Sequence, residues 1–298
     1  MVELQKIATE QRNPNTMNID TLPTLEMIKL INREDHKVAE AVGLVADKIA
    51  QAVDVIVDRL GKNGRLIYCG AGTSGRLGIL DAVECPPTYS TEPEMVQGMI
   101  AGGYPAIFKA VEGAEDSREL GVQDMRNIRF TAGDVLVGIA ASGRTPYVLG
   151  CMEYAKKLGA VTIAVTCCPG SALDDFADIG IAPCPGPEVV TGSTRMKSGT
   201  AQKMVLNMLS TGAMIKLGKV YGNLMVDVKP SNEKLIRRCV TIVSSATECD
   251  EAAAVAALEA CDYRPKVAIV MVLMGIGPEE ANDLLCKADG RIAKVLET

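Results

Sequence analysis

The sequence predicts an α/β fold, doubly wound around a mainly parallel sheet of five strands. Five apolar runs of strand length alternate with segments of helical composition, and two of these runs end in glycine turns rich in hydroxyl side chains. This alternation is typical of parallel strands joined by helices that cover both faces of the sheet. The expected strands are Arg65–Cys69, Met95–Ile100, Asp134–Ala140, Val161–Cys167 and Ile179–Pro183.

The segment before the first strand is expected to be a polar tail followed by helices. Residues 1 to about 22 are polar, whereas a helical apolar pattern opens at Val38 and runs towards Leu60. The short strands alone cannot cover the apolar stripe of this helix, so we expect it to lie at an interface.

The last third of the chain is predicted to be helical. A long helix is expected from about Lys197 to Leu217, after an earlier one at Pro146–Leu158. Four short helices should follow, at Asn232–Thr247, Glu251–Ala260, Pro265–Met274 and Pro278–Ala288. We therefore expect three parts: a tail with helices over residues 1–55, the sheet domain over 56–220 and a small helical domain over 233–298.

Composition limits the functions that this chain can have. Its 298 residues, 48% of them hydrophobic, are enough for a substantial core. The net charge of -6, with lysine and arginine scattered, argues against a nucleic-acid or anionic-membrane partner. The first residues include Glu3 and no apolar core of signal length, and no later apolar run approaches about 18 residues. We therefore expect a cytoplasmic protein.

Cysteine and histidine usage predicts neither disulfides nor a metal centre. None of the ten cysteines forms a C-x-x-C pair, so reduced, buried thiols are expected. The single histidine, His36, has no cysteine or second histidine near it in the sequence to complete a metal site. We expect His36 at the surface, and neither a metal nor another cofactor.

Two turns of similar composition carry the main functional signal. Gly70–Arg76 and Ala140–Thr145 each follow an expected strand and precede a helix. Glycine lets backbone N–H groups approach a ligand, serine and threonine add donors, and a helix N-terminus favours negative charge. Ligands of parallel sheets bind beyond the carboxyl ends of the strands, where both turns fall. The pair predicts a site for one phosphorylated small molecule.

The first turn also matches the dinucleotide pattern G-x-G-x-x-G, which is weak evidence by itself. A nicotinamide site would need an acidic residue at the end of the second strand, whereas Glu92 and Glu94 precede that strand. The second turn has no role in a dinucleotide site, so the phosphate site is favoured.

A third hydroxyl-rich stretch, Thr191–Arg195, follows the fifth strand and precedes the long helix. Ser193 or Thr194 could cap that helix, and the same hydroxyls could bind an oxyanion. Both interpretations stay open at this point.

Glu84 and Glu115 are the candidates for acid–base chemistry. Glu84 is expected at the end of the helix that follows the first turn, where a carboxylate opposes the helix dipole, and Cys85–Pro87 should stop that helix. Glu115 belongs to the acidic cluster Glu112–Ser117. From the spacing alone, a solvated surface carboxylate remains an alternative for both.

Several long motifs resemble the N-acetylmuramic acid 6-phosphate etherase family. The resemblance is carried by Ile67–Gly78, Glu84–Thr88 and Val111–Ser117, and Gly186–Lys203 is similar to a signature shared with the glucokinase regulator. It implies a sugar-isomerase-type domain of flavodoxin-like topology, a homodimer, and hydrolysis of a lactyl ether to N-acetylglucosamine 6-phosphate and D-lactate.

The resemblance also implies roles for individual residues. Glu84 becomes the proton donor and Glu115 the second catalytic carboxylate. The phosphate falls on Ser74, Ser142 and Thr145. The remaining candidate binding residues belong to the same three stretches and are Thr73, Gly75, Gly143 and Ser193.

The chemistry of this ether suits two carboxylates. In the open-chain sugar the aldehyde acidifies the C2 proton, and the ether oxygen on C3 lies β to the aldehyde carbon. Elimination followed by addition of water then breaks the ether without a metal, with one carboxylate ionised and one protonated. An aldose–ketose isomerase would share the first step and leave the ether intact, and a sugar-phosphate sensor would need the turns without the acids. These two remain the alternatives.

Overall fold

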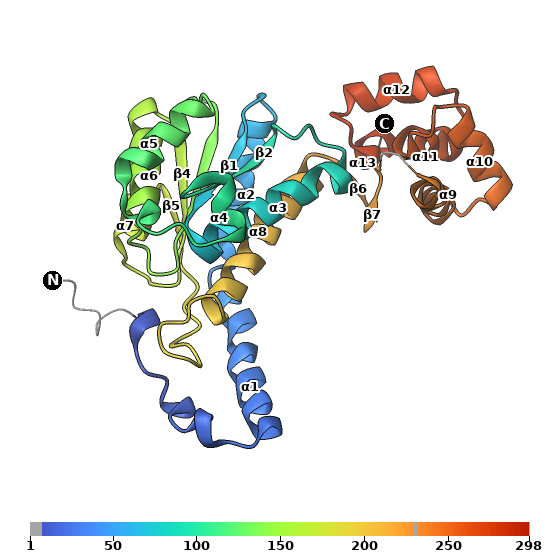
Figure 1. The fold of residues 1–298 in the computed structure, drawn as a ribbon. Coiled ribbons are helices and arrows are strands. Elements are labelled where there is room, and N and C mark those ends of the chain that lie inside the picture. Colours follow the sequence, from blue (N-terminus) through green and yellow to red (C-terminus); the bar gives the residue numbers. More distant parts are fainter. Residues whose placement is uncertain (1–7, 229, 231, 298) are drawn as a thin grey trace. The chain divides into compact units, whose positions relative to one another are not determined.

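The computed structural model describes residues 8–228, 230 and 232–297. The chain forms two compact units. One consists of the residues up to Val83 together with Glu94–Ser210, and the other of Glu84–Pro93 together with the residues from Thr211 on. The first unit holds the five-stranded sheet, and the second is mainly helical (Figure 1).

The predicted parallel sheet is confirmed. Its strands are β1 (Leu66–Gly70), β2 (Val96–Ile100), β3 (Val135–Ile139), β4 (Val161–Val165) and β5 (Ile179–Ile181). All neighbours pair in parallel, in the order β2-β1-β3-β4-β5, which is the flavodoxin-like order. Every residue of β1 and β3 is buried, which explains why these strands appear in the sequence as continuous apolar runs.

Helices cover both faces of the sheet. On one side lie α5 (Arg118–Asn127), α6 (Pro146–Leu158) and α7 (Ala172–Phe176), and on the other α2 (Ala46–Leu60), α3 (Gly72–Tyr89) and α8 (Lys197–Lys216) (Figure 1). On the second side a buried polar cluster joins strand and helices. Asp81 of α3 accepts hydrogen bonds from Tyr68 (2.8 Å), Asn207 (3.0 Å) and Ser210 (3.1 Å). Burial raises the pKa of Asp81, and these three donors oppose that effect.

The expectation of a polar N-terminal tail is wrong for the described residues from Ala8 on. They form three short 3-10 turns, Ala8–Glu10, Pro14–Thr16 and Ile19–Thr21. Asn13 and Thr16 are buried, and they donate to the carbonyl oxygens of Pro187 (3.1 Å) and Val189 (2.9 Å). The segment is polar because its side chains bind backbone carbonyl groups. These groups lie far away in the sequence. The first seven residues of the expected tail lie outside the described residues.

The apolar pattern from Val38 to Leu60 belongs to two helices, α1 (Thr24–Gly43) and α2, which are separated by Leu44 and Val45. Their stripe, which includes Val38, Val42, Ile49 and Ile56, is buried within this chain. We expected this stripe to lie at an interface, and that expectation is wrong. The stripe is already buried against other residues of the same chain.

Helix α3 does not stop at Cys85–Pro87 as expected. It continues through Pro86 and Pro87 to Tyr89, and the N–H of Ser90 donates to the Pro86 carbonyl at 3.0 Å. Both prolines lie in the last turns, where each removes one N–H donor and its fixed φ still suits a helix. Glu84 consequently lies inside a helix and not at its end.

The second unit contains the four helices expected after residue 232. They are α9 (Glu233–Thr247), α10 (Glu251–Glu259), α11 (Pro265–Met274) and α12 (Pro278–Lys287). A short hairpin of β6 (Val220–Tyr221) and β7 (Leu224–Met225) and a final helix α13 (Ile292–Leu296) were not predicted. Besides these helices, the second unit includes Glu84–Pro93 and the stretch from Thr211 to α9. The expected bounds of three parts, 1–55, 56–220 and 233–298, stay a prediction.

A buried ion pair joins α1 to the start of α8. Lys197 is fully buried, and its Nζ donates to Glu34 Oε2 at 2.8 Å and to the Pro185 carbonyl at 3.0 Å. Burial opposes ionisation of Glu34, but hydrogen bonds from Lys197, Lys37, Asn13 and Asn15 outweigh it and lower the pKa of Glu34 to about 2. Glu34 is therefore a carboxylate that the fold needs in its charged form.

The first turn of α8 is capped from the preceding loop. Glu188, fully buried, accepts from the backbone N–H groups of Lys197 and Ser198, both at 2.9 Å, and from the Ser198 hydroxyl at 2.8 Å. The expected cap by Ser193 or Thr194 is therefore wrong. A carboxylate binds the free N–H groups and the positive end of the dipole more strongly than a hydroxyl does.

Glu34→Gln should lower the free energy of unfolding at pH 7 by about 3 kcal/mol, because it leaves the buried Lys197 ammonium without a counter-charge. Urea unfolding measures the loss. In the unchanged chain this contribution is full above pH 4.5 and is lost as the pH falls from there towards 2, because the folded-state pKa is the lower one. Glu40→Gln, an exposed acid on the same helix, is the control, and equal losses in both variants would contradict the prediction.

Candidate active site

A cavity of about 370 Å³ opens in the first unit beyond the carboxyl ends of β1 and β3. The turn after β1 contributes Ala71–Ser74, and the turn after β3 contributes Ala140–Ser142 with Arg144–Pro146. These two strands are the place where the strand order reverses, and ligands of open parallel sheets bind at such points. The two turns singled out in the sequence thus face one cavity.

Five of the predicted site residues line this cavity: Thr73, Ser74, Ser142, Thr145 and Glu115. Four others are not part of its lining: Gly75, Gly143, Ser193 and Glu84. The ligand-binding and catalytic roles of all nine stay predictions.

Gly75 shapes the cavity through close packing. A Cβ on Gly75 would lie 2.8 Å from the Gly70 carbonyl oxygen and 2.6 Å from a side-chain carbon of Ile100. Only glycine lets α3 start directly against the end of β1. The first N–H groups of α3 therefore lie at the cavity.

Gly143 fixes the second turn. Its φ is +65°, and a Cβ there would lie 2.0 Å from Ser171 Oγ. Its N–H donates to the Ala140 carbonyl at 2.9 Å, and its carbonyl accepts from the N–H of Leu173 at 2.9 Å. These bonds hold Ser142 and Thr145 on either side of Gly143. Thr145 is the N-cap residue of α6 and makes no side-chain cap bond, so its hydroxyl is available to a ligand.

Ser74 connects the cavity to α8. Its hydroxyl donates to Gln202 Oε1 at 2.9 Å, while Gln202 Nε2 is buried and has no partner among the described residues. The reverse orientation of the amide would place Nε2 as a donor on Ser74 Oγ. The Ser74 proton would then be free to bind an oxyanion in the cavity.

Glu115 lies on a 3-10 turn, Ala114–Asp116, directly before α5, and its side chain is exposed. Ser117 caps α5 by accepting from the N–H of Leu120 at 3.1 Å. A Cβ on Gly150 of α6 would lie 2.3 Å from the Arg118 carbonyl oxygen, so α5 crosses α6 at very short range. This packing holds Glu115 next to the turn that begins α6.

Three charged residues that line the cavity were not among the predicted site residues: Glu10, Asp116 and Arg144. Thr194, considered together with Ser193 as a possible oxyanion ligand, also lines it. Arg144 follows Gly143 within the second turn, and a guanidinium is a strong phosphate ligand, so this signal was available. Glu10 gives no local signal. It reaches the cavity because Asn13 anchors its segment to Glu34.

Glu84 is exposed and follows Ser74 by ten residues on the same helix, which corresponds to about 15 Å along the helix axis. Its carboxylate is thus separated from the hydroxyls of the first turn.

Known proteins resemble the chain over nearly its full length. Its residues 48–156 match the glucokinase regulatory protein N-terminal SIS domain, and residues 118–212 match the SIS domain. An N-acetylmuramic acid 6-phosphate etherase of Photorhabdus laumondii is 60% identical over 98% of this chain and 97% of its own length. The chain belongs to the N-acetylmuramic acid 6-phosphate etherase family. Another etherase, from Klebsiella aerogenes, is 56% identical over 99% of this chain and 98% of its own.

A solved structure has the same kind of fold as this chain. Phosphoheptose isomerase of Neisseria gonorrhoeae aligns with a TM-score of 0.50 at 17% identity, over 65% of this chain and all of that one. The family resemblance drawn from the motifs is confirmed. Within the described part of the chain, no helix has the length and apolar character needed to span a membrane.

Gly143→Ala should lower the free energy of unfolding by about 2 kcal/mol more than Gly159→Ala. Both glycines have positive φ, so both variants carry the strain of an L-residue in that region. Only at Gly143 does the new Cβ also collide with Ser171, since nothing lies within 4 Å at Gly159. Urea unfolding of the two variants compares them, and equal losses would show that the turn yields to the added carbon.

Proposed function

We propose that this chain is a carbon–oxygen lyase that cleaves the D-lactyl ether of N-acetylmuramic acid 6-phosphate with water. The products are N-acetylglucosamine 6-phosphate and D-lactate, and the enzyme serves the cytoplasmic catabolism of cell-wall amino sugars. The observation that carries the proposal is the 60% identity with a protein of that name over almost the whole chain. The cavity supports it, because hydroxyls, an arginine and carboxylates line one polar pocket.

The substrate phosphate binds between the two turns. Hydroxyls of Ser74, Ser142 and Thr145 donate to its oxygens, and Arg144 supplies the counter-charge. The starts of α3 and α6 contribute their N-terminal dipoles, which favour an anion. Thr73 and Thr194 also line the cavity, and Ser193 directly precedes Thr194 in the chain.

The reaction proceeds on the open-chain sugar. A carboxylate takes the C2 proton, the electron pair forms a C2–C3 double bond, and the C3–oxygen bond breaks as a carboxyl group protonates the departing D-lactate oxygen. Water then adds its oxygen to C3, and C2 regains a proton. Following the family resemblance, Glu84 is the proton donor to the lactate oxygen and Glu115 is the second catalytic carboxylate.

Glu84→Gln and Glu115→Gln should each lower turnover by a factor on the order of one hundred or more, because glutamine keeps the shape and removes the proton transfer. The assay measures D-lactate released from N-acetylmuramic acid 6-phosphate. Glu112→Gln, an exposed acid of the same cluster, is the control and should keep full turnover. Unchanged turnover in both catalytic variants would discard the acid–base assignment. A folded chain that releases no D-lactate but interconverts aldose and ketose phosphates would be an isomerase.

Ser142→Ala should weaken the binding of N-acetylglucosamine 6-phosphate about tenfold, since one charge-assisted hydrogen bond is lost. Calorimetric titration gives the dissociation constants. N-acetylglucosamine without phosphate is the matched ligand, and its weak binding should not change with the substitution. A parallel loss for both sugars would place Ser142 away from the phosphate.

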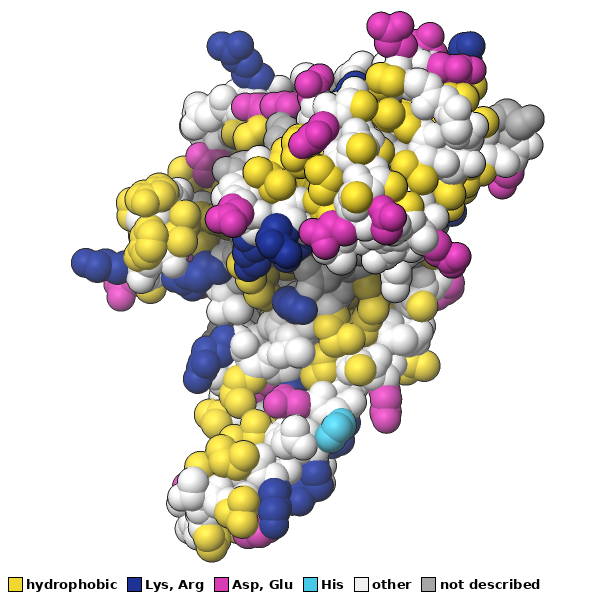
Figure 2. All heavy atoms as spheres, turned by 90° about the vertical axis from the view of Figure 1, so that its right-hand side faces the viewer, with side chains coloured by type: hydrophobic (Ala, Val, Ile, Leu, Met, Phe, Trp, Pro, Cys, Tyr) yellow, Lys and Arg dark blue, Asp and Glu magenta, His cyan; other side chains and the backbone are white. Residues whose placement is uncertain are grey.

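The chain should act as a homodimer. Large apolar side chains are exposed on α3 at Leu80 (50%) and Val83 (58%) and at the start of α1 at Leu25 (64%) and Ile28 (52%). Figure 2 shows hydrophobic side chains on the projection that carries His36, the only histidine, which lies on α1. Glu84 lies beside Leu80 and Val83 on α3. A second copy that covers Leu80 and Val83 would bring its own cavity to Glu84, so that each active site takes one glutamate from each copy.

Mixing the two inactive variants tests this shared site. In an equimolar mixture half of the dimers combine Glu84→Gln with Glu115→Gln, and each of these has one intact site, so about one quarter of the full activity should return. If both glutamates act within one chain, the mixture stays inactive. The control is Glu84→Gln alone, incubated under the conditions that let the mixed variants exchange subunits, and it should stay inactive.

A further inference from the structure

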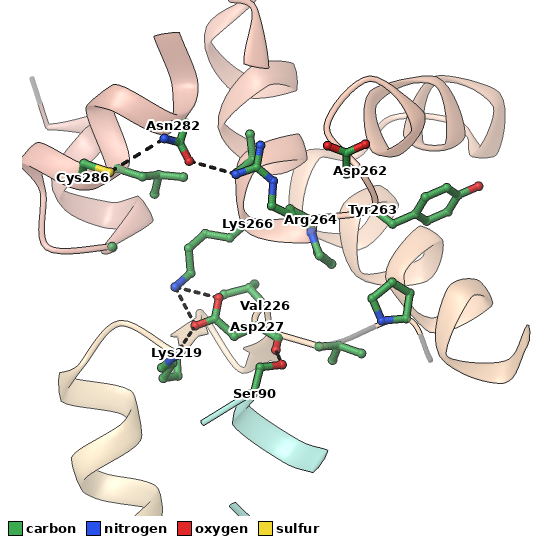
Figure 3. A pocket seen from close by; sticks show the side chains of 16 residues that line it. Ser90, Lys219, Val226, Asp227, Asp262, Tyr263, Arg264, Lys266, Asn282 and Cys286 are labelled. Atoms are coloured by element: carbon green, nitrogen blue, oxygen red, sulfur yellow. Dashed lines mark hydrogen bonds and ion pairs between the residues drawn. The ribbon is translucent and has the colours of Figure 1, made fainter. Parts of the chain in front are cut away.

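A second cavity, of about 560 Å³, lies within the helical unit and has no part in the proposed reaction. Its walls come from the end of α3, the stretch after α8, and the helices α11 and α12 (Figure 3). Its size is that of a small-molecule site. The charged side chains that line it are Lys219, Asp227, Asp262, Arg264 and Lys266.

Two lysines share one carboxylate in this cavity. Lys266 Nζ lies 2.8 Å from both carboxylate oxygens of Asp227, and Lys219 Nζ lies 3.0 Å from one of them. Figure 3 shows the two ammonium groups meeting at Asp227 from separate elements. All three side chains are largely buried, with exposures of 15% for Lys266, 22% for Lys219 and 17% for Asp227. One carboxylate carries one negative charge, so this cluster keeps one positive charge.

The lining as a whole also carries an excess of positive charge. It contains three cationic and two anionic side chains, so the cavity keeps one positive charge. Burial lowers the pKa of Lys266, Asp227 opposes that effect, and Lys219 adds to it by repulsion. Each ammonium carries three N–H donors and can bind an acceptor besides Asp227.

Helix α11 begins at this cavity. Arg264 is its N-cap residue and makes no side-chain cap bond, Pro265 is its first residue, and Lys266 and Val267 follow in the lining. Arg264 instead donates to Asn282 Oδ1 at 3.0 Å. The positive end of a ten-residue helix thus adds to the field of the two lysines.

The remaining wall is mostly apolar and includes Val226, Val228, Val267 and Leu285. These apolar side chains offer no hydrogen-bond donors and suit the hydrocarbon part of a ligand. We propose that the cavity binds a small organic monocarboxylate with an apolar body. Its carboxylate lies on Lys219 and Lys266, and its hydrocarbon part lies against Val226, Val267 and Leu285.

Calorimetric titration of the full chain with 4-methylpentanoate and with its neutral isostere 4-methylpentanamide tests the proposal. We expect one saturable site per chain for the carboxylate and at least about tenfold weaker binding of the amide, since only the anion makes charge-assisted bonds. Lys266→Met should weaken carboxylate binding by a similar factor. Lys234→Met, an exposed lysine on α9 outside the cavity, is the matched control and should bind as the unchanged chain does.

Lys266→Met deprives Asp227 of a partner, so a second variant keeps the test decisive if that one fails to fold. Cys286→Trp alters an exposed residue of the lining and should fill the cavity without touching the ion pairs. It should abolish carboxylate binding while the far-ultraviolet circular dichroism stays unchanged. Equal affinity for acid and amide, binding that survives in folded Cys286→Trp, or displacement of the carboxylate by inorganic phosphate at lower concentration would each overturn the proposal.

Discussion

The buried ion pair between Lys197 and Glu34 is the interaction on which the candidate active site depends. A buried ammonium without a counter-charge is strongly destabilising, so the packing of the first turn of α8 depends on Glu34, which α1 supplies. Asn13 then binds the same carboxylate and the Pro187 carbonyl, which holds the N-terminal segment in place. That segment delivers Glu10 to the cavity. The ion pair lies outside the cavity lining, yet it helps to position Glu10, which is part of that lining.

The sheet imposes the second constraint. Because all five strands are parallel, the turns after β1 and β3 leave the same edge of the sheet, and the reversal of strand order separates the helices that follow them. Close packing then fixes the turns themselves. Gly75 lets α3 begin against the end of β1, and Gly143 lets its turn pass Ser171. Ser74, Ser142 and Thr145 line one cavity as a consequence of this backbone packing.

The sequence predicts the sheet well because its strands are buried on both faces and are therefore apolar throughout, as in β1 and β3. It predicts the two turns because their glycines and hydroxyl residues stand next to one another in the sequence. It does not predict Glu188 as the cap of α8, since this carboxylate returns to the helix from a loop nine residues earlier. It does not predict the burial of Asn13 either, because the decisive partners, Glu34 and Pro187, are distant in sequence. These two errors fall where polar side chains form hydrogen bonds with residues distant in the sequence.

The position of Glu84 within α3 restricts how it can act. Ten residues of helix separate it from Ser74 by about 15 Å along the axis and turn its side chain by about 280°, whereas proton transfer needs approach to about 3 Å. Bending α3 to close this gap would break the bonds of Asp81 to Tyr68 and Ser210, which tie the middle of the helix to β1 and α8. A ligand that binds at Ser74 would have to span this distance to reach Glu84 of the same chain. The proposed shared site removes this requirement, because Glu84 of one copy would then act on a sugar phosphate in the cavity of the other copy.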